Sequence, residues 1–210
     1  MVTPPTKILD IASATEYLAA RDPILAAVIA AIGPCPLTQH TEYYQALVDS
    51  ILGQQLSVKA AAAIRSRFIA LYDGAYPSPE IICNTSIEKL RSAGLSRSKA
   101  AYIQDLATHI LDGRIDFSHI EHKDNNSIMR ELIAVKGIGE WTVHMFLIFC
   151  MGRLDVLPVG DLGIRTGIMR LYGLATLPTP TEVRGVADKH AWHPYESIAS
   201  WYVWQSLTLK

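Results

Sequence analysis

Residues 132–165 read LIAVKGIGEWTVHMFLIFCMGRLDVLPVGDLGIR, and more of the architecture follows from this stretch than from any other. One apolar segment runs into Gly137, and a second one leaves the turn after Gly139. Two helices that meet at a glycine turn leave backbone N–H groups without partners at the start of the second helix, where the helix dipole favours an anion. Because glycine lets a ligand approach the backbone closely, the stretch predicts a helical hairpin that binds a phosphate.

A single carboxylate follows the hairpin. Asp161 stands in the turn Pro158-Val-Gly-Asp161, directly before a further helical segment. Aspartate is a favoured N-cap residue, so taken alone Asp161 is first expected to cap a helix over 162–173. The structural role and a chemical role are compatible.

The composition is that of a folded protein with little overall charge. Of the 210 residues 50% are hydrophobic and 19% are charged, and the formal net charge is −1. No apolar run reaches the roughly 20 residues that span a bilayer, so no membrane association is expected. Proteins that bind nucleic acid through its phosphates normally carry many basic residues. Any positive surface on this chain must therefore be local.

The cysteine and histidine patterns argue against disulfides and against a resident metal. Cys35, Cys83 and Cys150 are odd in number and far apart, so reduced thiols and a cytoplasmic location are expected. Three cysteines cannot hold a four-cysteine iron–sulfur cluster, and the histidines show no zinc-binding spacing. The N-terminal MVTPPTKILD lacks the pattern of an export signal.

Helical periodicity runs through nearly the whole chain, and no strand-like alternation appears. Two helices are expected within the first 40 residues. Several helices are expected to begin after capping residues, namely Thr41, Ser57, Ser86 and either Ser96 or Ser98. Others are predicted over 126–135, 140–151, 162–173 and 194–207, with Pro178 to Pro180 as a linker.

The predicted class is all-α, with one domain over residues 1–210. Its expected segments are N-terminal helices over 1–40, a first lobe over about 41–125, the hairpin and the aspartate over about 126–175, and C-terminal helices over 176–210 that pack back.

The motif Gly137-Ile-Gly139-Glu-Trp141-Thr142 together with Pro158-Val-Gly-Asp161 resembles the helix-hairpin-helix superfamily of DNA base-excision glycosylases. The alkylated-purine branch, the 3-methyladenine DNA glycosylase II type, matches best, over most of residues 41–207. The resemblance implies two helical lobes with an interlobe cleft. It also implies a nucleoid-associated enzyme that flips alkylated purines, such as 3-methyladenine and 7-methylguanine, out of double-stranded DNA and excises them, which initiates base excision repair. A monomer is expected, because one copy makes a complete cleft.

In that family, an aspartate at the place of Asp161 is the sole catalytic carboxylate, and it stabilises the positive charge that develops on the sugar. An alkylated purine already carries positive charge and leaves as a neutral base, so one carboxylate can suffice. Superfamily members that also cut the strand have a lysine at the position of Trp141. Because tryptophan cannot form a Schiff base, a monofunctional glycosylase without lyase activity is predicted.

Two tryptophans are the expected walls of the base pocket. Trp141 would attract a cationic methylated base by roughly 1–2 kcal/mol, although it can instead anchor the hairpin as a core residue. Residues 192–204 are similar to a family motif whose last tryptophan, here Trp204, stacks on the flipped base. The tryptophans of this segment can also be core residues. The family usually has arginine where this chain has Glu196.

The resemblance also indicates the DNA contacts. In the turn Ile51-Leu-Gly-Gln-Gln-Leu-Ser57, Gln55 would fill the gap left by the flipped nucleotide, with Leu56 as the apolar alternative. Alternatively, Gln54 and Gln55 only satisfy backbone groups at a helix end. Contacts to the DNA backbone are expected from four residues of the hairpin, namely the amides of Gly137 and Gly139, the hydroxyl of Thr142 and the side chain of Lys136. Weaker candidates are Lys59, Arg97, Lys99 and Arg165.

In relatives the hairpin also holds a monovalent cation through main-chain carbonyls, and no other cofactor is expected. Two other functions stay open. The chain could be a non-catalytic helix-hairpin-helix protein that only grips DNA. It could also be a glycosylase for a different lesion, for which a neutral leaving base would need a proton donor.

Overall fold

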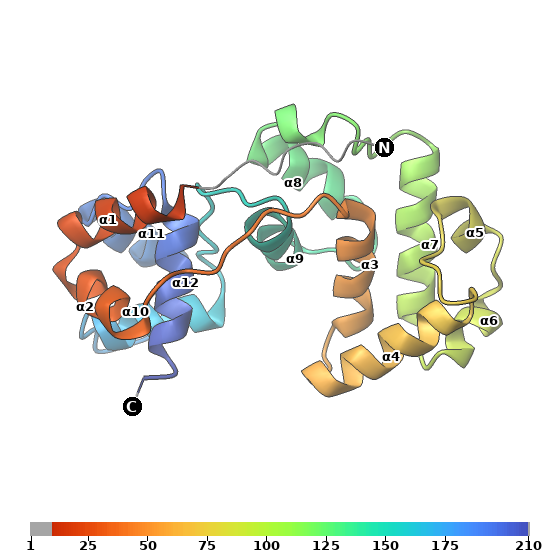
Figure 1. Cartoon of the computed structure of the whole chain (residues 1–210), viewed down its shortest axis with the longest axis horizontal. Coiled ribbons are helices and arrows are strands. Elements are labelled where there is room, and N and C mark those ends of the chain that lie inside the picture. Colours follow the sequence, from red (N-terminus) through yellow and green to blue (C-terminus); the bar gives the residue numbers. More distant parts are fainter. Residues whose placement is uncertain (1–9, 210) are drawn as a thin grey trace. The chain divides into compact units, whose positions relative to one another are not determined.

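The computed structural model describes residues 10–209, and every regular element within them is a helix. The predicted all-α class is therefore confirmed. The backbone divides into two compact units (Figure 1). The terminal unit joins Met1–Thr41 with Leu147–Lys210, and the middle unit comprises Glu42–Phe146. The division falls inside residues 126–175, so the hairpin belongs to the middle unit and Asp161 to the terminal unit.

In the terminal unit, α12 (Glu196–Ser206) is the central helix. It packs against α1 (Ile11–Arg21), α2 (Pro23–Ile32) and α10 (Leu162–Leu171), while α11 (Pro180–Lys189) packs against α10. These contacts leave α12 buried over most of its surface. The two helices expected in the first 40 residues are thus present as α1 and α2.

The close packing of α10 against α12 depends on a glycine. A Cβ at Gly167 would lie 2.8 Å from the carbonyl oxygen of Val203 on α12. Because backbone cannot yield as a flexible side chain can, a larger residue at 167 would push the two helices apart.

A buried carboxylate connects several parts of the terminal unit. Asp22, which is 0% exposed, caps α2 by accepting from the N–H groups of Ile24 and Leu25 at 3.0 Å each. It also accepts from Trp192 Nε1 at 2.9 Å and from the Tyr172 hydroxyl. A buried charge needs such partners. Trp192 is therefore a core residue, the alternative that the sequence left open for this segment.

In the middle unit, α7 (Arg97–Leu111) is the central helix, and α3 (Tyr43–Gly53), α5 (Pro79–Cys83) and α6 (Ile87–Ser92) pack against it. α4 (Val58–Ala70) packs on α3. The buried residues of α7 recur at helical spacing, and they are Ala100, Ile103, Leu106, Ala107 and His109.

The hairpin follows the short η1 (Ile120–His122). Its helices are α8 (Asn125–Ile133) and α9 (Glu140–Met145), which pack against each other. The helix predicted over 140–151 changes character after Met145, since η2 (Phe146–Cys150) is a π-helix. This η2 begins at the last residue of the middle unit and continues into the terminal unit.

Most of the predicted helix starts are confirmed. The hydroxyls of Ser57, Ser86 and Ser96 each accept from a backbone N–H three residues later, as N-cap residues do. The prediction for Thr41 is wrong, because α3 begins at Tyr43 after Glu42, which makes no side-chain capping bond.

Two helices that begin at proline were missed. Pro178 to Pro180 is predicted as a linker, but Pro180 is the first residue of α11 and Thr179 caps that helix in a capping box with Glu182. Likewise, Pro79 starts α5 after the N-cap Ser78. Proline fits the first helical position because its missing N–H would have no partner there in any case. In both places, a proline that follows a serine or threonine therefore marks the start of a helix and not an irregular segment.

Candidate functional site

Asp161 caps a helix and binds an indole at the same time. Its Oδ1 accepts from the backbone N–H of Ile164 at 2.8 Å, which confirms the predicted N-cap of α10. The same oxygen accepts from Nε1 of Trp204, 43 residues later on α12, at 2.8 Å. Two donors on one oxygen hold the carboxyl group in a single orientation beside the indole ring.

An aromatic pair adjoins this carboxylate. The rings of Trp204 and Phe149 lie with their centroids 5.7 Å apart and an interplanar angle of 31°. Phe149 comes from η2 and exposes 39% of its surface, and Leu162, the neighbour of Asp161, exposes 64%. Within the terminal unit, the carboxylate therefore lies next to apolar side chains that are not fully buried. The sequence pattern did not single out Phe149, because its apolar run does not tell exposed positions from buried ones.

Gly163 leaves the space that the indole occupies. A Cβ at this position would lie 2.9 Å from Trp204 Cδ1 and 3.0 Å from Asp161 Oδ1. Gly160, on the other side of Asp161, borders open space. The hydrogen bond between Asp161 and Trp204 therefore requires glycine at 163 but not at 160.

The hairpin turn of the middle unit requires glycine at one of its two glycine positions. Gly137 has φ +84°, a conformation that residues with a Cβ rarely adopt, and the ring of Tyr102 on α7 occupies the place where a Cβ would stand. Gly139, the N-cap of α9, has φ −104° and borders open space. Both glycines are exposed, as expected for residues that offer backbone N–H groups to a ligand.

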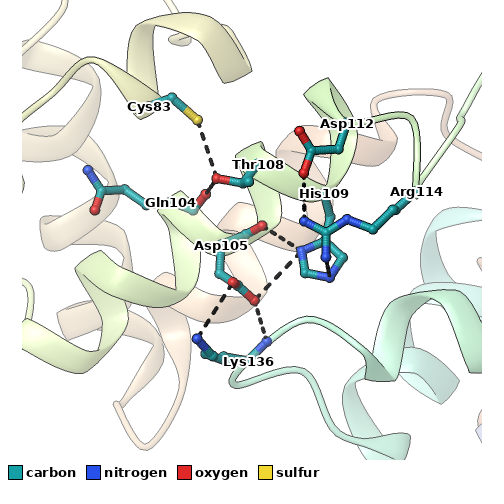
Figure 2. A network of polar contacts seen from close by, with 8 residues as sticks. All are labelled: Cys83, Gln104, Asp105, Thr108, His109, Asp112, Arg114 and Lys136. Carbon is teal, nitrogen blue, oxygen red and sulfur yellow. Dashed lines mark hydrogen bonds and ion pairs between the residues drawn. The ribbon is translucent and has the colours of Figure 1, made fainter.

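Helix α7 fixes the residue before this turn through the network in Figure 2. Asp105 Oδ2 accepts from the backbone N–H of Lys136 at 2.8 Å, and its Oδ1 lies 4.0 Å from Lys136 Nζ. His109 Nδ1 lies 2.9 Å from the Asp105 carbonyl, and Nε2 lies 2.9 Å from Arg114 Nη1. A carbonyl only accepts and a guanidinium only donates, so the ring proton sits on Nδ1. The network holds the Lys136 backbone while its side chain stays 77% exposed.

The turn between α3 and α4 gives its two glutamines different roles. Gln54 Nε2 donates to the carbonyl of Gly137 at 2.7 Å, so Gln54 has the structural role that the sequence left open. Gln55 has φ +58° and is exposed at the tip of the turn, and Leu56 beside it is 39% exposed.

Two of the weaker candidates for DNA contacts are engaged within the protein. Lys99 Nζ donates to the carbonyls of Leu52 and Gln54 at the C-terminal end of α3. Arg165 Nε donates to the carbonyl of Pro178 at 2.7 Å. Lys59 and Arg97 are exposed. Thr142 is only 5% exposed, which fits packing of α9 better than the DNA contact predicted for its hydroxyl.

The remaining pocket candidates belong to different units. Trp141 exposes 53% of its surface in the middle unit, so it is not the core anchor of the hairpin that the alternative described. Trp204 belongs to the terminal unit, and a pocket that both tryptophans line stays a prediction, as does the interlobe cleft.

Glu196 is 4% exposed, with Oε1 3.1 Å from His193 Nδ1 and 3.8 Å from Arg184 Nη1. The glutamate that stands here in place of the family's usual arginine is therefore buried and has polar contacts within the terminal unit.

Residues 10–209 contain no group of three or more histidine, cysteine or acidic side chains that could hold a metal ion. Within the same residues, no helix is both long and apolar enough to cross a membrane. The three cysteines are free thiols.

A family model and several known proteins match this chain. The family model described as HhH-GPD superfamily base excision DNA repair protein matches residues 48–190, which include the hairpin and Asp161. The chain is 31% identical over 205 residues to the alkylbase DNA glycosidase-like protein mag2 of Schizosaccharomyces pombe, and the match covers 95% of each.

Two solved structures share the fold. The DNA-3-methyladenine glycosidase from Bacillus halodurans superimposes with a TM-score of 0.84 and 37% identity, over 97% of this chain and 92% of that one. The Schizosaccharomyces pombe 3-methyladenine DNA glycosylase in complex with abasic DNA superimposes with a TM-score of 0.81 and 31% identity, over 94% of this chain and 97% of that one. The family match covers well over half of the sequence, and the chain belongs to the HhH-GPD superfamily of base excision DNA repair proteins.

Proposed function

We propose that this protein is a monofunctional DNA glycosylase that hydrolyses the N-glycosidic bond of alkylated purines in double-stranded DNA. The observation that carries the proposal is the Asp161 carboxylate, held by Trp204 beside the Phe149 ring. A fixed carboxylate stabilises the positive charge that grows on the sugar, and an indole face attracts a cationic methylated base. Two relatives described above support the same substrate class, since one is a 3-methyladenine glycosidase and the other is a 3-methyladenine glycosylase in complex with abasic DNA.

The reaction follows from these residues. The alkylated nucleotide rotates out of the helical stack, and its base lies against Trp204 beside Asp161, with Trp141 kept as the second aromatic candidate for the base pocket. The bond between C1′ and the base nitrogen breaks, and its electron pair neutralises the charged base, which leaves. Asp161 stabilises the resulting oxocarbenium-like sugar. Water then adds to C1′ and loses a proton, so an abasic site remains.

The proposed enzyme stops after this hydrolysis. Strand cleavage by relatives of this superfamily starts from a lysine amine that attacks C1′, and Trp141 stands at that position. An indole offers no amine to form a Schiff base, so the DNA strand stays intact at the abasic site.

Binding of the DNA is assigned to the middle unit. The amides of Gly137 and Gly139 and the ammonium of Lys136 would contact the sugar–phosphate backbone, and Gln55 would fill the gap that the flipped nucleotide leaves. A single copy carries all of these residues, so we propose a monomer. It would act on chromosomal DNA, in the cytoplasm near the nucleoid.

A backbone-bound monovalent cation stays part of the proposal. The carbonyl of Val135 accepts from Ile138 N–H at 3.1 Å, and that of Gly137 accepts from Gln54 at 2.7 Å. Each carbonyl oxygen has a second lone pair, so the hairpin carbonyls fit such an ion. When bound, the ion would add positive charge next to a phosphate.

The test is to incubate the protein with duplex DNA treated with a methylating agent and to separate the released bases by chromatography. Free 3-methyladenine or 7-methylguanine should appear. The strand should break at the abasic site only after alkali, and borohydride should trap no covalent complex. Binding without any released base would favour the non-catalytic alternative. Release of oxidised or mismatched bases from a substrate panel would favour a different lesion.

We predict that Gly163→Ala slows excision by roughly 10- to 100-fold, because the added methyl group displaces the indole of Trp204 from Asp161. Single-turnover excision with enzyme in excess measures the effect. Gly160→Ala is the matched control, since a Cβ at that position meets nothing within 4 Å. Equal rates for the two variants would show that the contact between Asp161 and Trp204 has no part in the reaction.

A further inference from the structure

Lys99 lies on α7 and reaches the turn that carries Gln55. Its Nζ donates to the carbonyl of Leu52 at 2.9 Å and to that of Gln54 at 2.7 Å. These carbonyls stand at the C-terminal end of α3, where helical C=O groups lack intrahelical partners and the helix dipole favours a cation. The ammonium group therefore closes the end of α3.

Lys99 is also partly withdrawn from water. The lysine is half-buried, and burial lowers the pKa of its ammonium group. Its two acceptors are backbone oxygens of the protein, so its ammonium group is already hydrogen-bonded, unlike that of an extended surface lysine that is available to bind a phosphate. This placement separates it from Lys136, whose side chain is 77% exposed.

The turn is held on both sides of Gln55. On one side, Lys99 binds the Gln54 carbonyl, and the Gln54 side chain binds the Gly137 carbonyl of the hairpin. On the other side, the Leu56 N–H donates to the carbonyl of Gly53 at 3.2 Å. Gln55 itself has φ +58°, which is an uncommon conformation for a residue other than glycine. Neighbouring contacts must maintain such a conformation.

The same face of α7 also supports the hairpin. Lys99, Tyr102 and Asp105 are three residues apart, so their side chains leave the helix on neighbouring sides. Tyr102 packs on Gly137, and Asp105 holds the backbone of Lys136 (Figure 2). One rigid helix thus sets the distance between the two segments that are proposed to touch DNA.

We propose that Lys99 is a positioning residue for base flipping, which fixes the turn Gly53–Ser57 so that Gln55 enters the DNA stack in one defined geometry. This inference rests on the proposed glycosylase function. Lys99 acts through Gln55 and not through a phosphate. Loss of its donors therefore slows nucleotide extrusion while leaving the electrostatic part of DNA binding in place.

The experiment compares Lys99→Met, Gln55→Ala and the double variant in single-turnover excision from a duplex with one methylated purine. Lys99→Met keeps the length of the side chain but removes its donors. We expect a roughly tenfold slower rate, because both hydrogen bonds from the charged ammonium group to backbone carbonyls are lost. The double variant should be no slower than Gln55→Ala alone. Lys99→Arg, which retains donors, should recover part of the rate. Lys89→Met, an exposed lysine on α6, is the matched control.

The salt dependence of duplex binding separates positioning from phosphate contact. If Lys99 positions the turn, the slope of log K against log salt stays as in the wild type for Lys99→Met. A slope lower by about one would show a phosphate contact and would overturn the proposal. Additive effects in the double variant would overturn it as well. Thermal unfolding checks the fold, and if Lys99→Met is unstable, Lys99→Gln, whose shorter side chain cannot donate to both carbonyls, provides the same comparison with and without Gln55→Ala.

The excision rate of the wild type distinguishes a failure of the proposed glycosylase function from a failure of the positioning role of Lys99. Absence of base release from the wild type would refute the glycosylase function. Release by the wild type together with equal rates for Lys99→Met and Lys89→Met would refute only the positioning role.

Discussion

Asp161→Asn is expected to lower the excision rate by about 100- to 1000-fold while the protein folds and binds DNA as before. Asparagine is as good an N-cap as aspartate, so its side-chain oxygen can still accept from Ile164 N–H and Trp204 Nε1. The substitution therefore removes the negative charge and little else. Because that charge is what stabilises the oxocarbenium-like sugar, the loss falls on the chemical step.

Single-turnover excision measures the chemical step, and the affinity for a duplex with an uncleavable abasic analogue measures DNA binding. Asp188→Asn, which removes an exposed carboxylate from α11 of the same unit, should match the wild type in both. An Asp161→Asn variant that cleaved at the wild-type rate would end the assigned mechanism.

Gly137→Ala is expected to destabilise the protein by about 2–4 kcal/mol and to weaken duplex binding. Alanine at φ +84° is strained by about 1 kcal/mol, and its Cβ would collide with the Tyr102 ring, which adds an overpacking cost of roughly 1–3 kcal/mol. The hairpin must move away from α7 to relieve this collision. Its backbone amides then leave the positions proposed for the DNA contact.

Denaturant unfolding gives the stability change, with Gly139→Ala as the matched comparison two residues away. Gly139 has an ordinary φ and open space around it, so its replacement should cost less than about 1 kcal/mol. Similar losses for the two variants would mean that the contact with Tyr102 does not define the turn.

Local features of this chain were largely predictable. The serines at 57, 86 and 96 and Asp161 cap helices as expected, because an N-cap bonds to a backbone N–H only three residues away. Where two local signals competed, prediction failed. Pro180 was predicted to lie in a linker although it follows the capping residue Thr179, and Thr41 was predicted to cap a helix that begins at Tyr43.

The residues of the candidate site also differ in how far they could be predicted from their neighbours in the sequence. Asp161 and the two glycines of the hairpin were found from motifs a few residues long. Phe149 was recognised only from its contact with Trp204, 55 residues away in the sequence. Lys99 was a weak candidate for a phosphate contact, and its hold on the turn was recognised only from acceptors 45 to 47 residues away. No spacing rule connects residues so far apart, since their contact depends on how distant helices pack.

By itself, the sequence determined the helical class, the glycine hairpin, most helix starts and the lone carboxylate, because each is set by neighbours within one or two turns. Only the tertiary structure decided that Trp192 is core while Trp204 binds Asp161, and that Lys99 holds the turn of Gln55. The physical reason is that the sequence around a tryptophan or a lysine does not differ between a core, a binding and a structural role. Its role is set by the acceptor that folding brings to it.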